Sequence, residues 1–257
     1  MNFNTAALMS PSKRPLIGTI AGPGGMGKTS LAALFPAPIF LRVEDGTGSL
    51  SILHQFKPDF ELKSVAQSPV ATHSDNLREM INSLRTDKHS RKTLVIDTVT
   101  QLDTLIQAEI LKSEPKAKNI NAAGGGYGAG WNMVANVHRE IRELCGLLAE
   151  EREMNIIFLA HEALETVDSA DMESFQRATL RMNAKCVQPY VDNVDLVAFL
   201  KLEAFTIGGE DQKKRATGSG RRLISCYAVP SNVGKNRFGI SQDIPYDLSC
   251  NPFEQYL

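Results

Sequence analysis

The stretch "AGPGGMGKTS", residues 21–30, decides the fold. Its spacing matches G-x-x-x-x-G-K-[ST], the pattern of a phosphate-binding loop. Glycines let the backbone turn tightly and point consecutive N–H groups at an anion, and the helix that follows directs the positive end of its dipole to the same place. The whole loop is predicted to cradle the phosphates: Gly22, Pro23, Gly24, Gly25, Met26, Gly27, Lys28, Thr29 and Ser30.

The side chains and flanks of this loop agree with a nucleotide site. Lys28 is placed to reach the β- and γ-phosphates, and the Thr29 hydroxyl to ligate Mg²⁺. The apolar, β-branched run 15–22 predicts a strand before the loop, and 28–35 predicts a helix after it. We therefore expect ATP and Mg²⁺ as the cofactors.

Patterning along the rest of the chain predicts strands that alternate with helices. This alternation is typical of an α/β fold with a mainly parallel sheet covered by helices on both faces. The last two predicted strands should form an antiparallel hairpin, and the glycine-rich segment 116–130 a loop. The expected organisation is a tail (1–14), a core (15–240) and a C-terminal tail (241–257). Predicted strands are 15–22, 38–45, 60–67, 92–98, 155–161, 194–203 and 221–230, and predicted helices are 28–35, 74–87, 101–113 and 130–153.

Composition narrows the class of protein. The 257 residues are 42% hydrophobic and 22% charged, which is ordinary for one large globular core, and the net charge of −1 gives no global basic field for nucleic acid. No run approaches the roughly 18–20 apolar residues of a membrane span. The four cysteines are widely spaced without C-x-x-C, which favours reduced core thiols in a cytoplasmic protein over a zinc site or disulfides.

Polar side chains at the ends of predicted strands complete the site. Asp97 ends the apolar run "TLVID" (93–97) and would hold Mg²⁺ through water. Glu44, with Asp45 as the lesser candidate, ends the strand after the loop helix and is a candidate to orient and deprotonate water. His161 ends "NIIFLAH" and is either a sensor of the γ-phosphate or a structural histidine.

Single-stranded DNA is the candidate macromolecular ligand. Binding without sequence preference needs cations along a track and flat aromatic surfaces. Tyr127 lies between glycines in "GGGYGAGW", with Trp131 after it; the alternatives are a tyrosine folded onto the surface and a tryptophan in a helix core. The cations nearest in sequence are Lys112, Lys116 and Lys118, and a second cluster comprises Lys213, Lys214, Arg215, Arg221 and Arg222, unless both are simply solvated.

Taken in order, these segments resemble the core of RecA-type ATPases. The closer likeness is to compact phage nucleotide-binding proteins that act in single-strand annealing or recombination. It rests on "GPGGMGKTSLAALFPAPIFLRVEDG", "TLVIDTVTQLD", "GGGYGAGWNMV", "IIFLAHE" and "GKNRFG", and it spans roughly residues 15–240.

The resemblance implies specific roles. Glu44 takes the place of the catalytic glutamate and His161 that of the γ-phosphate sensor. Residues 119–130 and 162–182 fall where the family has its two DNA-binding loops. Lys235 and Arg237 resemble the basic pair that enters a neighbouring subunit's ATP site, which implies a homo-oligomer, ring or filament; the alternative is a solvated pair on a turn.

Three functions follow as hypotheses. The favoured one is an ATPase that binds single-stranded DNA, is stimulated by it and serves DNA recombination or annealing, with no membrane partner. A motor or switch subunit of the helicase-loader or packaging type, acting on a protein partner, uses the same core. A small-molecule kinase is the third, but the insert between Asp97 and His161 has no arginine before Arg139 to form a phosphate-gripping lid.

Overall fold

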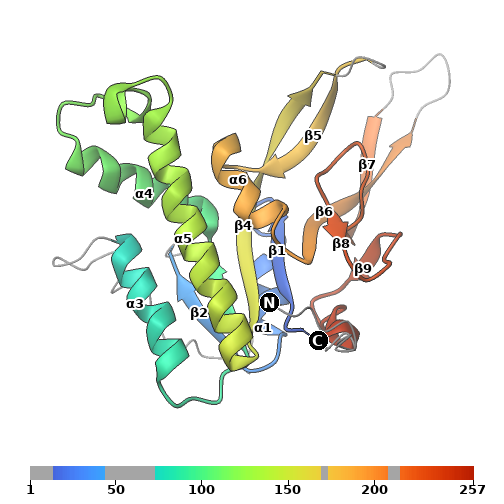
Figure 1. The fold of residues 1–257 in the computed structure, drawn as a ribbon. Helices are drawn as coiled ribbons and strands as arrows, with labels where there is room; N and C mark the ends of the chain where they lie inside the picture. The colour runs from blue at the N-terminus through green and yellow to red at the C-terminus, as the bar shows by residue number, and fades with distance from the viewer. Residues whose placement is uncertain (1–13, 44–72, 169–172, 208–214) are drawn as a thin grey trace, which may run out of the picture.

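The computed structural model describes residues 14–43, 73–168, 173–207 and 215–257. Its centre is a parallel sheet in the strand order β2-β3-β4-β1-β6 (Figure 1). These strands are β1 (Ile17–Gly22), β2 (Pro38–Arg42), β3 (Thr93–Asp97), β4 (Asn155–Val167) and β6 (Leu196–Ile207). The predicted α/β class with a mainly parallel sheet is confirmed.

Antiparallel strands extend this sheet. The order continues β6-β7-β9, through β7 (Arg215–Ser225) and β9 (Ile244–Tyr246), while β5 (Phe175–Leu180) pairs with β4 and β8 (Lys235–Asn236) with β6. The predicted C-terminal hairpin is therefore present as β6–β7. The predicted strand 60–67 lies outside the described residues.

Helices cover both faces of the parallel sheet. On one face pack α3 (His73–Thr86), α4 (Val99–Ser113), α5 (Ala129–Arg152) and α6 (Ala184–Val191), and on the other α1 (Lys28–Ala33) with residues of the C-terminal segment. Successive strand residues alternate between the two layers, because side chains along a strand point to opposite faces. Ile156 and Phe158 belong to the first layer, and Ile157 and Leu159 to the second.

The segment 162–182 is not the loop that the resemblance implies. Residues up to Val167 continue β4 and pair with β5 as an antiparallel hairpin. A cross-strand ion pair joins Glu165 to Arg177, with 2.7 Å between Oε1 and Nη2. This hairpin is half-exposed and polar, so hydrophobic periodicity does not reveal it.

Residues 116–130 are also more ordered than a plain loop. A 3₁₀ helix, η2 (Ile120–Gly125), buries Ile120 and Ala123, and the Trp131 indole Nε1 donates to Asn121 Oδ1 at 2.7 Å. Gly130 permits this packing, because a Cβ there would lie 2.0 Å from the Ile120 carbonyl oxygen.

The C-terminal segment 241–257 packs on the core. Within it, β9 pairs with β7, Phe253 is fully buried, and η3 (Glu254–Tyr256) follows. Cys145, Cys186 and Cys226 are buried thiols, whereas Cys250 is exposed, so the expectation of core thiols is wrong for Cys250. Within the described ranges, no helix has the length and apolar character needed to cross a bilayer.

Candidate functional site

The phosphate loop links β1 to α1. Gly27 precedes the helix with φ of 92°, a left-handed conformation that favours glycine. The Lys28 side chain is buried over the loop, where its Nζ donates to the carbonyl oxygens of Gly22 and Pro23, both at 2.9 Å. The ammonium is therefore already positioned inside the curve of the loop.

Asp97 lies beside this loop. Its carboxylate is 5% exposed, and the Thr29 hydroxyl donates to its Oδ2 at 3.0 Å. A hydroxyl and a carboxylate this close are oxygen donors suited to one Mg²⁺ ion. Val43 N, directly before Glu44, donates to the Asp97 carbonyl at 2.6 Å. Glu44 and Asp45 themselves lie outside the described residues.

Strand order brings His161 to the same edge. β4 lies between β1 and β3, with Gly22 opposite His161 and Asp97 opposite Leu159. His161 N donates to Thr100 Oγ1 at 2.9 Å, and its carbonyl accepts from Arg181 N at 2.8 Å. The main chain at His161 thus bridges the first turn of α4 and the end of the β4–β5 hairpin.

Glu162 is a site residue that the sequence reasoning missed. Burial raises the pKa of its carboxyl, and the Lys28 charge opposes that rise. Glu162 therefore lies within electrostatic range of the Lys28 ammonium. The only sequence signal was its position next to His161 in "LAHE".

The C-terminal segment also contacts the phosphate loop. A Cβ at Gly27 would lie 2.6 Å from Leu248 Cδ2 and 3.8 Å from Tyr246 Cε1. Leu248 has a φ of 73°, and the buried Tyr246 hydroxyl has no hydrogen-bond partner among the described residues. Burial raises the pKa of Tyr246. Tyr246 and Leu248 were set apart in a predicted tail, so sequence reasoning did not place them here.

Lys235 and Arg237 lie at the opposite end of the parallel strands, where the strands begin. β8 pairs with the first residues of β6, and Lys235 Nζ donates to the Asp192 carbonyl at 2.7 Å. Arg237 Nη1 lies 3.3 Å from Asp195 Oδ1. Burial, and then the charge of Arg237, lower the pKa of Lys235.

This edge is distant from the chain's own phosphate loop. Asp195 N donates to the Ile17 carbonyl, at the start of β1, whereas the loop begins at its end, Gly22. Five residues of strand correspond to about 17 Å.

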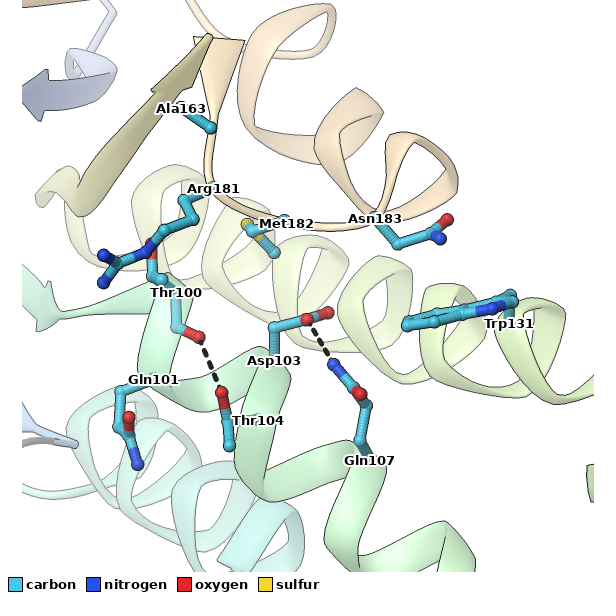
Figure 2. Close-up of a pocket in the computed structure, with 10 residues that line it drawn as sticks. All are labelled: Thr100, Gln101, Asp103, Thr104, Gln107, Trp131, Ala163, Arg181, Met182 and Asn183. Atoms are coloured by element: carbon cyan, nitrogen blue, oxygen red, sulfur yellow. Dashed lines mark hydrogen bonds between the residues drawn. The ribbon is translucent and has the colours of Figure 1, made fainter. Parts of the chain in front are cut away.

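A pocket of about 540 Å³ is lined by Thr100 and Arg181, the two residues whose atoms bond to the main chain of His161 (Figure 2). The side chains around it come from α4, α5, β4 and the segment after β5. Within it, the Gln107 amide donates to Asp103 Oδ2 at 2.7 Å, and the partly buried Trp131 lies across from Arg181. Its lining consists of Thr100, Gln101, Asp103, Thr104, Gln107, Trp131, Ala163, Arg181, Met182 and Asn183.

The candidate DNA-binding residues are only partly described. Tyr127 is fully exposed, with φ of 51° between glycines, and Lys112, Lys116 and Lys118 are exposed. Lys213 and Lys214 lie outside the described residues, as does the side chain of Arg215, whose backbone begins β7. Arg221 is exposed and Arg222 half-buried on β7.

Comparison with known proteins identifies the core. No curated protein matches the sequence. A family model described as an AAA domain matches residues 14–238, which includes the phosphate loop, Asp97, His161 and the Lys235–Arg237 pair. The chain therefore belongs to this AAA-domain family, and its core is a nucleotide-binding, P-loop ATPase-type domain.

Proposed function

We propose that the protein is a DNA-stimulated ATPase that binds single-stranded DNA during recombination or annealing. The observation that carries the nucleotide part is the 3.0 Å contact of Thr29 with Asp97 beside the Lys28 ammonium. Fold alone does not fix function, so each step below is argued from side chains.

The ATP site uses charges already gathered at the loop. Lys28 exchanges its two carbonyl partners for β- and γ-phosphate oxygens. Thr29 and Asp97 would hold Mg²⁺, which neutralises phosphate charge when bound. Glu44 is the proposed water-orienting base. Glu162 is a second candidate carboxylate for that task, since it follows His161 in β4 and burial raises its pKa, as suits a general base.

The proposed DNA face centres on the glycine-rich stretch. Tyr127 offers an exposed ring for stacking, which contributes about 1–3 kcal/mol per base. Lys116 and Lys118 supply nearby positive charge, and Lys213, Lys214 and Arg215 are a second proposed phosphate contact. The acidic side of the β4–β5 hairpin is partly neutralised, because Arg177 pairs with Glu165.

Coupling between the two sites is proposed to run through His161. Its backbone contacts Thr100 and Arg181, which both line the pocket beside Trp131. A change at the γ-phosphate that moves His161 would therefore shift both pocket walls. If His161 is only a structural residue at a strand end, His161→Ala should leave the ATP dependence of DNA affinity unchanged. If His161 couples the two sites, the same substitution should remove that dependence.

Oligomerisation is proposed to complete the ATP site. Lys235 and Arg237 lie at the opposite edge from their own phosphate loop, so they can act only on the nucleotide of a neighbouring copy. Arg237 is well placed for this, since its side chain is 66% exposed. Positive groups supplied in this way stabilise charge that develops on the phosphates.

The decisive experiment is phosphate release by the purified protein, with and without an oligothymidylate, and with a duplex of equal length as control. We expect turnover that rises with the single strand and is lost in Lys28→Ala but not in Lys201→Ala, an exposed lysine paired with Asp243. Turnover indifferent to DNA would overturn the DNA role and favour a protein-partnered switch or a kinase.

A second experiment addresses the DNA face itself. Tyr127→Ala should weaken binding of the single strand by about 5- to 150-fold, as expected for one lost stacking contact. Tyr127→Phe keeps the ring and should bind like the unaltered protein. Equal affinities for all three proteins would remove Tyr127 from the interface.

A further inference from the structure

Three buried side chains from three helices meet behind the pocket. Asp103 of α4 is 5% exposed, and His138 of α5 and Cys186 of α6 are fully buried. Their oxygen, nitrogen and sulfur atoms all lie within 4.8 Å of one another. His138 Nε2 is 3.0 Å from Asp103 Oδ1. One carboxylate, one imidazole and one thiol thus converge in the core from three different helices.

We propose that Asp103, His138 and Cys186 bind a Zn²⁺ ion that joins α4, α5 and α6. One thiolate, one imidazole and one carboxylate suit this borderline-soft cation better than Mg²⁺ or Ca²⁺, which prefer oxygen alone. Tetrahedral Zn²⁺ ligands lie about 3.4–3.6 Å apart, given the usual bond lengths. Small side-chain rotations would therefore bring the three atoms into place.

Neighbouring side chains hold two of these three groups, His138 and Asp103, as the side chains that orient metal ligands do. The Tyr190 hydroxyl lies 2.8 Å from His138 Nδ1, and Gln107 donates to Asp103 Oδ2. With Nε2 on the metal, Nδ1 would carry the proton and donate to the Tyr190 oxygen, which fixes the imidazole tautomer. Tyr190 is itself fixed by an edge contact with Phe158.

The site is accessible from the pocket, and the proton that the Cys186 thiol would lose on metal binding can leave to solvent. Asp103 and Gln107 line the pocket of Figure 2, so the side facing the pocket can supply a water as fourth ligand. Burial and the Asp103 carboxylate raise the pKa of the Cys186 thiol to about 12. The metal-free sulfur therefore keeps its proton, and Zn²⁺ binding replaces that proton, which passes to solvent.

The sequence expectation against a zinc site rested on the missing C-x-x-C spacing. That test detects ligands that come in pairs from one turn. Here the ligands are separated by 35 and 48 residues (from 103 to 138 and from 138 to 186), and only helix packing brings them together. The proposal does not depend on the proposed function, since no residue of the phosphate loop takes part.

The test is titration of the purified protein with Co²⁺, read as the thiolate-to-metal charge-transfer absorption. The work uses a Cys250→Ser background, because the exposed Cys250 thiol could bind metal on its own. Co²⁺ at the Thr29–Asp97 site gives no such band, since that site holds no sulfur. We expect about one equivalent of Co²⁺ with a tetrahedral spectrum, displaced by Zn²⁺.

Matched variants decide which thiol is involved. Cys186→Ser should abolish the band, whereas Cys145→Ser, the same change at another fully buried thiol, should keep it. Tyr190→Phe should keep the band but weaken metal binding about 10- to 100-fold, because it removes the hydroxyl that holds the His138 ring. If Cys186→Ser does not fold, Tyr190→Phe and the Cys250→Ser protein still decide the question. No band at saturating Co²⁺ in the folded Cys250→Ser protein, or a band that survives Cys186→Ser, would overturn the site.

Discussion

The parallel strands end at one side of the sheet, here called the carboxyl edge, and begin at the opposite side, the amino edge. Charged side chains at these two edges have different partners. At the carboxyl edge, Lys28 is held over a loop by two carbonyl oxygens, beside the Thr29–Asp97 pair. At the amino edge, Asp195 accepts from Ile17 N and pairs with Arg237. The carboxyl edge is arranged to receive an anion. At the amino edge, Asp195 and Lys235 instead form hydrogen bonds with the chain's own backbone.

This difference indicates which edge a small ligand can complete and which edge needs a second copy of the protein. The carboxyl edge has its donor groups converging within one chain, so a small ligand can complete it. At the amino edge Arg237 is exposed and far from the chain's own phosphate loop, so any catalytic use of it requires a second copy of the protein. The predictions below test that contrast.

The largest effect is expected at the phosphate loop. Lys28→Ala should lower ATP turnover by at least about 100-fold, because it removes a charge aimed at the phosphates. Phosphate release at saturating ATP measures this, and an unchanged circular dichroism spectrum would show that the fold is intact. Turnover within a few-fold of the unaltered protein would rule out this loop as the hydrolytic site.

The amino edge is best tested by mixing two inactive proteins. Lys28→Ala and Arg237→Ala should each be nearly inactive. At equal amounts, about a quarter of the interfaces should combine an intact loop with an intact Arg237, and activity should return to about that level. A protein that carries both substitutions, Lys28→Ala and Arg237→Ala, is the matched control, because adding it to Arg237→Ala supplies no intact Arg237 and should restore nothing. Full activity of Arg237→Ala alone would contradict a role in a neighbour's site.

The glycine-rich stretch offers a comparison of stability within a few residues. Gly130→Ala places a methyl group 2.0 Å from the Ile120 carbonyl and should cost about 1–3 kcal/mol of unfolding free energy. Gly125→Ala meets no atom within 4 Å, but its φ of 88° is strained for alanine, so about 1 kcal/mol is expected. Urea unfolding of both variants measures the difference, and equal midpoints would show that the contact between η2 and α5 is loose.

The smallest effect is the pH dependence contributed by Glu162. Burial raises the pKa of Glu162 in the folded protein above its ordinary value of 4.5, so this group contributes most to stability below that pH. The contribution is lost as pH rises through the folded pKa, and Glu162→Gln should flatten the stability curve in this window. Parallel curves for the two proteins from pH 4 to 7 would mean that Glu162 is solvated like an ordinary surface carboxylate.

Much of this architecture was predictable because local chemistry dictates it. Gly27 needs a left-handed φ that glycine tolerates, and β3 is buried along its length, so both leave a clear mark in the sequence. The order of strands is a different matter. Nothing in the apolar run of β4 says that it inserts between β1 and β3, yet this insertion brings His161 opposite Gly22.

What could not be predicted depends on tertiary contacts. The β4–β5 hairpin is stabilised by backbone pairing and by the Glu165–Arg177 contact, which leave a weak apolar pattern. Glu162 becomes a candidate only once folding buries its carboxyl within the electrostatic range of Lys28. The candidate DNA-binding side chains remain predictions, since exposure of Tyr127 shows availability and not a ligand.

The contact of Leu248 with Gly27 joins the phosphate loop to a segment that lies outside the family match. The family match stops at residue 238, but β9 and Phe253 lie beyond it and fill the apolar layer behind α1. Tyr246 and Phe253 belong to the same buried cluster as Leu31 and Phe35, and Leu248 lies against Gly27 of the phosphate loop. The phosphate loop is thus covered in part by side chains that the family match does not include.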